Sequence, residues 1–202
     1  MLYLVRHGQT EANARGQLLG RTDLPLDSLG QQQALAVAEA LGAAVADGDE
    51  PCRVVTSPLQ RTRQTAAAIS QRLGVTVDVD ERWVELDYGE LEGVPMQQVP
   101  AHVWRTWRSD PAFTPQGGES LVALRKRVET ALEDLVADAS RGNVIVVSHV
   151  SPIKAAVVWA LGVSDEAVWR LFVAPGSITK INTSGGIPAL HGFNQVPNGA
   201  AR

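Results

Sequence analysis

The sequence predicts an α/β fold in which a mostly parallel central sheet lies between two layers of helices. Three short apolar segments, at residues 2–5, 53–56 and 144–147, are typical of buried strands. A segment with apolar residues at helical spacing follows each of them. Alternating strands and helices favour a parallel sheet, because a helix carries the chain back to the starting edge. A length of 202 residues fits one such domain.

Four longer helices are expected from their apolar stripes, at residues 30–45, 58–73, 121–139 and 152–161, and a shorter one is expected at 164–171. Ser57-Pro58 and Ser151-Pro152 predict helix starts, because serine caps a helix and proline suits its first position. An exposed loop is expected at 47–51. A hairpin around 184–186 is expected to close the sheet, with strands at 177–182 and 187–193.

Residues 94–116 interrupt this regular pattern. The segment contains four prolines and the side chains of Trp104, Trp107 and Phe113. We expect a helix-containing excursion that packs over the strand ends as a partial lid. Its tryptophans are expected to anchor it to the core rather than to stack on a substrate.

Composition excludes several classes of protein. A net charge of −4 argues against general binding to nucleic acid or to membrane surfaces. No apolar run approaches the roughly 18 residues of a membrane span, and no secretory pattern precedes the first strand. Cys52 is the single cysteine, so no internal disulfide can form. These features together predict a cytoplasmic protein.

Basic side chains follow all three predicted central strands. Arg6 and His7 end the first strand, Arg61 lies one helical turn after the second, and His149 follows the third. Parallel strands end at one edge of the sheet, where ligands bind in open α/β folds. Two helix N-termini begin at the same edge and attract anions through their free N–H groups. The sequence therefore predicts a site for phosphate or another small oxyanion.

A metal site is the competing use of two histidines. The chain has four histidines, and no two of them show the helical pairing of a zinc protease motif. Two arginines beside a bound cation would also repel it. The glycine-rich motifs that bind dinucleotides or nucleoside triphosphates are absent from the sequence. We therefore expect neither a metal nor a cofactor.

Five segments, in order along the chain, resemble the motifs of the histidine phosphatase superfamily, which includes phosphoglycerate mutase-like and acid phosphatase-like proteins. They are Leu-Val-Arg-His-Gly-Gln-Thr at 4–10 with Asn13, Ser-Pro-Leu-Gln-Arg-Thr at 57–62 with Gln-Thr-Ala at 64–66, Glu85 with Gly89 and Glu92-Gly93, Gly-Gly-Glu-Ser at 117–120, and Val-Ser-His at 147–149. The tripeptide Arg-His-Gly alone would be a weak signal, whereas five motifs in register are specific. The resemblance implies a single histidine phosphatase domain over residues 1–202 with a phosphoglycerate mutase-like fold.

The resemblance also implies roles for individual residues. His7 would be the nucleophile of a two-step phosphoryl transfer, with the second ring nitrogen donating to a backbone carbonyl. Glu85 would protonate the leaving oxygen and then activate water. The phosphoryl oxygens would be bound by Arg6, Arg61, His149 and Asn13, and Gly20 lies where relatives carry a substrate-contact loop. No metal would be needed, because arginine and histidine supply the positive charge.

Three functions remain open at this point. A metal-independent phosphomonoesterase acting on a small phosphorylated metabolite is favoured, because residues 94–116 contain only two basic residues, Arg105 and Arg108, whereas family mutases carry more after the acid loop. Leu19 also departs from the small polar residue of the mutases. The alternatives are a 2,3-bisphosphoglycerate-dependent phosphoglycerate mutase and a non-catalytic module that binds a phospholigand. The oligomeric state stays open, with a homodimer favoured.

Overall fold

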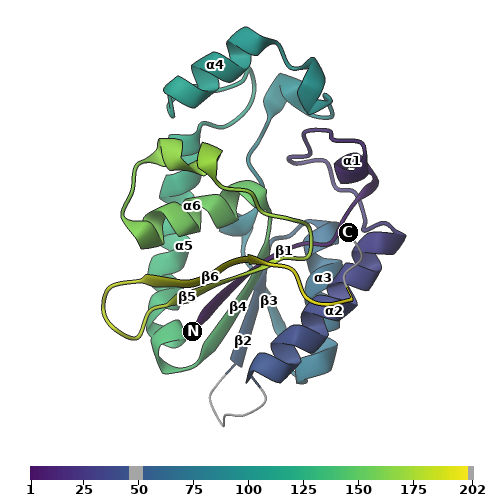
Figure 1. Ribbon diagram of the computed structural model, residues 1–202, viewed down its shortest axis with the longest axis vertical. Coiled ribbons are helices and arrows are strands. Elements are labelled where there is room, and N and C mark those ends of the chain that lie inside the picture. The colour runs from purple at the N-terminus through teal and green to yellow at the C-terminus, as the bar shows by residue number, and fades with distance from the viewer. Residues whose placement is uncertain (46–51, 200–202) are drawn as a thin grey trace.

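Six strands form one sheet in the order β3-β2-β4-β1-β5-β6 in the computed structural model, which describes residues 1–45 and 52–199 (Figure 1). Strands β1, β4, β2 and β3 are mutually parallel, β5 is antiparallel to β1, and β6 is antiparallel to β5. The prediction of a mostly parallel sheet closed by a hairpin is confirmed. The strands are β1 Leu2–Arg6, β2 Cys52–Thr56, β3 Val77–Val79, β4 Asn143–Ser148, β5 Ile178–Asn182 and β6 Ala189–Gln195.

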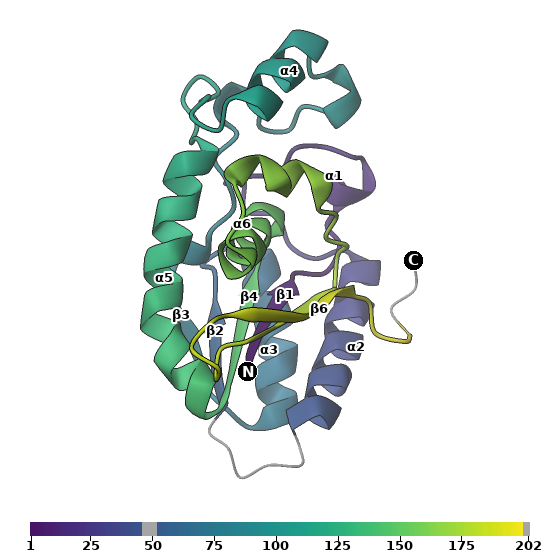
Figure 2. The same ribbon diagram turned by 60° about the vertical axis from the view of Figure 1, so that its left-hand side comes forward.

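Helices cover both faces of this sheet (Figures 1 and 2). Helices α2 and α3 pack on one face, and α5 and α6 pack on the other. Helix α4 lies at the end of the molecule toward which the parallel strands run. The described helices are α1 Glu11–Ala14, α2 Ser28–Val45, α3 Gln60–Leu73, α4 Ala101–Ser109, α5 Leu121–Arg141 and α6 Val150–Leu161, with short 3₁₀ helices η1 Glu81–Trp83, η2 Gly89–Leu91, η3 Met96–Gln98 and η4 Asp165–Arg170.

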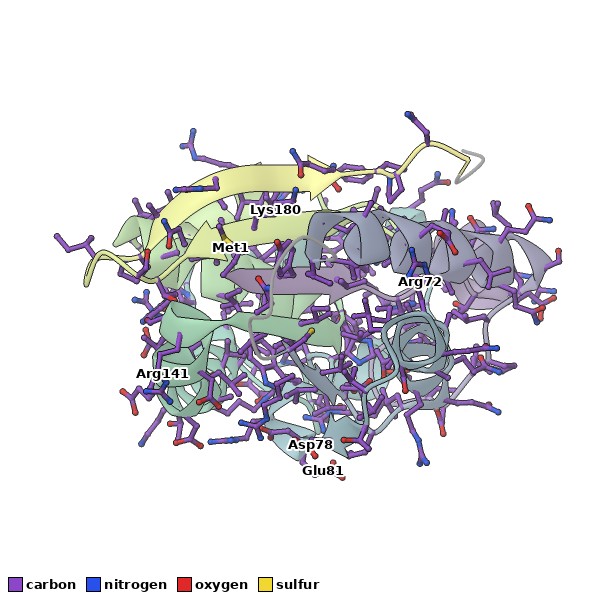
Figure 3. The ribbon with its side chains drawn as sticks, turned by 90° about the horizontal axis from the view of Figure 1, so that it is seen from below. Met1, Arg72, Asp78, Glu81, Arg141 and Lys180 are labelled. Atoms are coloured by element: carbon purple, nitrogen blue, oxygen red, sulfur yellow. The ribbon has the colours of Figure 1, made fainter. Side chains whose placement is uncertain are left out.

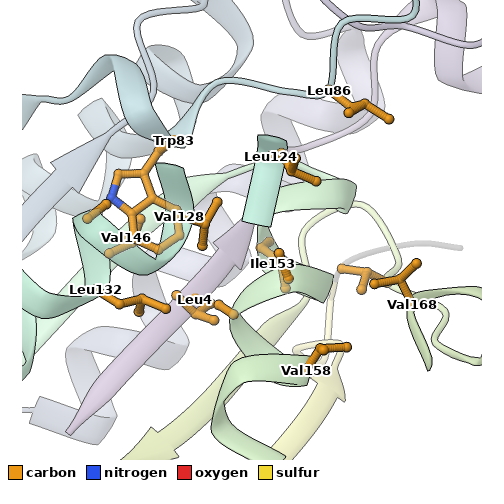
Figure 4. Packing of buried hydrophobic residues seen from close by; sticks show 14 of the residues in the cluster. Leu4, Trp83, Leu86, Leu124, Val128, Leu132, Val146, Ile153, Val158 and Val168 are labelled. Carbon is orange, nitrogen blue, oxygen red and sulfur yellow. The ribbon is translucent and has the colours of Figure 1, made fainter. Parts of the chain in front are cut away.

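Alternate residues of the central strands belong to two separate hydrophobic clusters, because successive side chains of a strand point to opposite faces. Tyr3 and Val5 pack with residues of α2 and α3. Leu2 and Leu4 pack in the larger cluster with α5 and α6, where Figure 4 shows Leu4 near Val128 and Ile153. This two-sided burial explains the uninterrupted apolar run of β1 and confirms the predicted three layers.

The end of the sheet opposite α4 carries paired surface charges (Figure 3). Arg72 pairs with Glu39 at 3.2 Å, and Arg141 pairs with Asp138 at 3.0 Å. Such exposed pairs contribute about 0–1 kcal/mol each. The amine of Met1 donates to backbone carbonyls at the end of α5, which ties the chain start to this surface.

Two helices begin at residues other than those that the serine-proline pairs predict. Helix α3 begins at Gln60 with Leu59 as its N-cap, and α6 begins at Val150 with His149 as its N-cap. The hydroxyl of Ser57 contacts the ring of His149, so its main partner lies in another segment. Pro152 is the third residue of α6, where its missing N–H breaks no intrahelical bond.

The remaining expectations have mixed outcomes. The shorter helix expected at 164–171 is the 3₁₀ helix η4, which begins one residue after Ser164. The loop expected at 47–51 lies outside the described residues. The long helix expected at 121–139 is present as α5, with the side chain of Ser120 accepting the N–H of Ala123 at its start. No helix within residues 1–45 and 52–199 is long and apolar enough to cross a membrane.

Gly8 is required for a close approach of two backbones. Its φ lies outside the left-handed region, so the loop after β1 does not need glycine for its backbone angles. A Cβ at this position would lie 2.2 Å from the carbonyl oxygen of Gly30 near the start of α2. The loop after β1 therefore packs directly on that helix, which helps to fix the end of β1.

We predict that Gly8→Ala lowers the free energy of unfolding by about 1–3 kcal/mol or more, because the added methyl forces the loop off α2. Gly185→Ala is the matched control, because a Cβ there meets no atom within 4 Å and φ is not left-handed. Urea denaturation of both variants measures the effect. Equal stability of the two variants would contradict this account of the packing.

Candidate active site

The end of β1 places the imidazole of His7 in a buried position with a defined proton. Its Nδ1 lies 2.6 Å from the carbonyl oxygen of Gly8. Because a carbonyl only accepts hydrogen bonds, Nδ1 carries the proton and Nε2 keeps a free lone pair. Thr65 accepts the N–H of Gly8 at 3.2 Å, and Ser148 accepts the N–H of His7 at 3.1 Å. The donation from His7 to a backbone carbonyl is therefore present as the resemblance implies.

The surroundings of His7 hold the ring neutral. Burial lowers its pKa well below 6.5, and the charges of Arg61 and Arg6 lower the pKa further. The hydrogen bond to Gly8 acts in the opposite direction and is the weakest of these influences. A neutral imidazole with an accessible lone pair is a competent nucleophile at neutral pH.

Arg6 presents a buried donor that no described residue accepts. Its Nη1 donates to the carbonyl of Val173 at 2.7 Å, while Nε is buried without a hydrogen-bond partner in residues 1–45 and 52–199. Burial lowers the pKa of Arg6 to about 10, which leaves the guanidinium charged at neutral pH. A buried donor without a partner is energetically costly.

Arg61 and His149 form a buried layer against the ring of His7. Arg61 donates through its terminal nitrogens to the carbonyls of Gly20 at 2.7 Å and Thr22 at 2.8 Å, and through Nε to Nδ1 of His149 at 3.2 Å. Because a guanidinium only donates, the proton of His149 is on Nε2, which lies 2.8 Å from the hydroxyl of Ser57. The two imidazole rings meet edge to face, with their centroids 5.1 Å apart.

Glu85 occupies the N-terminus of α6. Its carboxylate accepts the backbone N–H groups of Leu86 at 2.7 Å, Val150 at 3.1 Å and Ser151 at 3.1 Å. At the start of α3, the N–H of Gln60 donates to the carboxylate of Asp23. The expectation of free N–H groups is therefore wrong at the start of α6, where Glu85 binds them, and for the N–H of Gln60 at the start of α3. The same contacts single out Glu85 among the five acids of its loop.

Glu92 is a structural residue of the site that sequence reasoning does not identify. Its carboxylate accepts the N–H groups of Gly20, Arg21 and Thr22 at 2.9 to 3.3 Å. A Cβ at Gly20 would lie 2.6 Å from the carbonyl of Leu86, so only glycine fits there. Glu92 thus holds the segment whose carbonyls bind Arg61. The third motif contains Glu92, but no local signal assigns it this long-range contact.

A cavity of about 480 Å³ opens in front of this cluster. It is lined by Arg6, His7, Asn13 and Glu85, together with apolar residues. The Asn13 oxygen accepts the N–H of Thr10 at 3.2 Å, which leaves the amide NH₂ to donate. Gly20, Arg61 and His149 are not among the described residues that line the cavity. The cavity therefore brings a guanidinium and a neutral amide together with an unprotonated ring nitrogen and a carboxylate, a set of groups that phosphoryl transfer can use.

Known proteins share both the sequence pattern and the fold. The model of the histidine phosphatase superfamily (branch 1) matches residues 2–196. The glucosyl-3-phosphoglycerate phosphatase of Mycobacterium tuberculosis is 33% identical over 200 residues, which cover 87% of each chain. The bifunctional protein Rv2228c of the same organism is 34% identical over 181 residues, which cover 88% of this chain. The chain spans about half of that relative, 49% of its length.

Solved structures agree with this assignment. A mycobacterial glucosyl-3-phosphoglycerate phosphatase in complex with VO3 superposes with a TM-score of 0.85 at 30% identity, over 96% of this chain and 98% of the other. A mutant phosphoserine phosphatase from Entamoeba histolytica in complex with phosphoserine also has a TM-score of 0.85, at 27% identity and 96% coverage of both chains. The match over nearly the whole chain, the order of the motifs and the shared phosphoglycerate mutase-like fold place this protein in branch 1 of the histidine phosphatase superfamily.

Proposed function

We propose that this chain is a phosphomonoesterase that transfers a phosphoryl group from a small phosphorylated metabolite to His7 and then to water. The observation that carries this proposal is the pairing of two available groups at one cavity. They are the lone pair of His7 Nε2 and the charged guanidinium of Arg6, and both residues line that cavity. A nucleophile beside a charged donor is suited to a phosphoryl group, whose phosphorus is attacked while its oxygens are bound.

In the first step, the lone pair of His7 Nε2 attacks phosphorus and the ester P–O bond breaks. Glu85, in its protonated form, gives its proton to the leaving oxygen, so that a neutral alcohol departs. The imidazole becomes positively charged, and the Nδ1–H bond to Gly8 supports that charge. Arg6 and the amide of Asn13 bind the phosphoryl oxygens, on which negative charge is spread in the transition state.

In the second step, the roles of Glu85 are reversed. The carboxylate takes a proton from water while the water oxygen attacks phosphorus, and the bond from phosphorus to His7 Nε2 breaks. Inorganic phosphate leaves, and both His7 and Glu85 return to their starting forms. Three backbone N–H groups hold the Glu85 carboxylate in place for both steps.

Arg61 and His149 support this chemistry from the buried layer. The charge of Arg61 is among the causes that lower the pKa of His7. Glu92 fixes the carbonyls that orient Arg61. We assign Arg61 and His149 to electrostatic stabilisation of the phosphoryl group bound at His7. Gly20 belongs to the backbone segment whose carbonyls bind Arg61.

The alternatives differ in the fate of the phosphoryl group after the first step. A phosphoglycerate mutase returns the phosphoryl group to a bound acid, whereas a phosphatase gives it to water. Relatives named for phosphatase activity on glucosyl-3-phosphoglycerate and phosphoserine support the second outcome. A non-catalytic module would have no use for Glu85 fixed beside a neutral His7.

We predict that the protein releases phosphate from p-nitrophenyl phosphate, phosphoserine or glucosyl-3-phosphoglycerate, with the same rate in the presence of EDTA. His7→Ala removes the nucleophile and is expected to lower kcat on the order of a thousandfold or more. Phosphate release and 3-phosphoglycerate isomerisation with 2,3-bisphosphoglycerate are followed in parallel.

Each outcome of this screen separates the alternatives. Isomerisation without release would identify a mutase, and a requirement for metal would contradict metal-independent catalysis. Binding of phosphate by the folded protein, with no turnover of any ester, would identify the binding module.

We predict that Glu85→Gln lowers kcat by about 10²–10⁴-fold, because glutamine cannot carry the proton of either step. The loss should be greater for an alkyl phosphate than for p-nitrophenyl phosphate, whose leaving group needs no proton. Glu90→Gln is the matched control, because Glu90 is an exposed acid of the same loop. Steady-state kinetics on both esters, with thermal unfolding as a check of folding, measures the effect. Unchanged kcat in Glu85→Gln would exclude Glu85 as the proton carrier.

A further inference from the structure

A second, smaller cavity of about 150 Å³ is lined by residues of α4, α6 and η4, among others. Its walls are almost entirely apolar and include three indole rings, those of Trp104, Trp107 and Trp169. Aliphatic side chains such as Leu121 and Val168 complete the walls, and Lys154 is the one charged residue among the described residues that line it. We call this space the aromatic cavity.

The aromatic cavity adjoins the phosphate site. Five residues line both spaces: Leu18, Tyr88, Met96, Val150 and Lys154. An ester whose phosphate contacts Arg6 and His7 therefore has an apolar space within reach of its organic group. Apolar cavities with a few polar groups are typical of sites for small organic molecules.

The aromatic walls form a fixed arrangement. The rings of Trp104 and Trp107 are stacked, with centroids 5.7 Å apart and an interplanar angle of 16°. Trp169 meets both rings edge to face, at 6.0 and 5.8 Å. The indole N–H of Trp104 donates to the carbonyl of Met96 at 3.3 Å, which anchors α4 to the neighbouring segment. The walls are thus arranged before any ligand binds, which limits the entropic cost of binding.

The indole nitrogen of Trp107 is not exposed to the cavity. The indole nitrogen of Trp107 is buried and makes no hydrogen bond among the described residues, although Trp107 is only 1% exposed. Trp83 has a similar nitrogen without a partner in the described ranges but lines neither cavity. Because this nitrogen has almost no accessible surface, Trp107 offers the cavity an apolar wall and no accessible hydrogen-bond donor.

We infer that the organic group of the substrate is apolar and ring-shaped, and that it occupies the aromatic cavity while its phosphate contacts Arg6 and His7. This inference rests on the proposed phosphatase function and deepens it. The sequence-based expectation that the tryptophans only anchor the excursion is then incomplete. Trp107 packs in the core, yet Trp104, Trp107 and Trp169 also form the walls that recognise the substrate.

The test compares two alkyl phosphates that differ by a ring. Ethyl phosphate and 2-phenylethyl phosphate have leaving alcohols of similar acidity, so the ratio of their kcat/KM values reports binding of the ring. We expect the wild-type protein to favour 2-phenylethyl phosphate by about tenfold or more, as burial of additional apolar groups does in hydrophobic pockets. Phosphoserine is included as a polar ester.

Two variants test whether the preference for 2-phenylethyl phosphate depends on the aromatic cavity. Val168→Phe fills the aromatic cavity, and Trp104→Leu removes one aromatic wall at a half-buried position. Both are expected to bring the ratio close to one. Val79→Phe is the matched control, because it makes the same exchange at an exposed position of β3 that lines neither cavity, and it should keep the wild-type ratio.

The outcomes separate this inference from the function on which it rests. If both esters are hydrolysed through His7 with a ratio near one, or if phosphoserine is preferred, the phosphatase proposal stands and the apolar substrate is wrong. A ratio that survives in both cavity variants would place ring binding elsewhere and overturn the inference. Failure to hydrolyse any ester, p-nitrophenyl phosphate included, would overturn both proposals together.

Discussion

Two buried guanidinium groups beside one imidazole determine the character of this site. Arg6 and Arg61 are at most 9% exposed, and their charges lower the pKa of His7, which is itself 3% exposed. Removing such charges from water costs several kcal/mol per ion unless polar groups of the protein bind them. The chain supplies backbone carbonyls at Val173, Gly20 and Thr22. The result is a positive site that keeps the ring of His7 unprotonated.

The register of the sheet brings these groups together. Arg6 of β1 lies opposite Ser148 of β4, and Thr56 of β2 lies opposite Val147 of the same strand. Because all three strands are parallel and end at one edge, residues far apart in sequence meet there. A series of hydrogen bonds then connects these buried groups to the neighbouring loops. Glu92 holds the segment around Gly20, this segment holds Arg61, and Arg61 holds His149.

Local pattern is enough to predict most of the fold. The apolar runs of β1, β2 and β4 and the stripe of α5 identify the layers correctly, because burial on both faces or on one helical stripe leaves a direct mark in the sequence. The polar residues that follow those strands are located at the same time, because the end of each apolar run marks the end of a strand. The family resemblance then singles out Glu85, which composition alone does not separate from its neighbouring acids.

Contacts between distant segments leave no such mark. Ser57 has the local pattern of a helix cap, but its hydroxyl lies 2.8 Å from the ring of His149, 92 positions further along the chain. The N–H groups at the start of α6 have the pattern of a free anion site, yet they bind Glu85. Trp169 lies in a short 3₁₀ helix, and only packing shows that it joins Trp104 and Trp107.

The protonation state of His7 is the most direct test of this account. Nitrogen-15 NMR of histidine-labelled protein, with the His7 signals assigned by comparison with His7→Ala, reports the tautomer and charge of the ring. The pKa of His7 is lowered, so the ring should stay neutral, with its proton on Nδ1, as the pH falls from about 8 to about 5.5 through the ordinary histidine value. A ring that gains its second proton near pH 6.5 would contradict the account, because the nucleophile would then lack the electrostatic setting on which the proposed function depends.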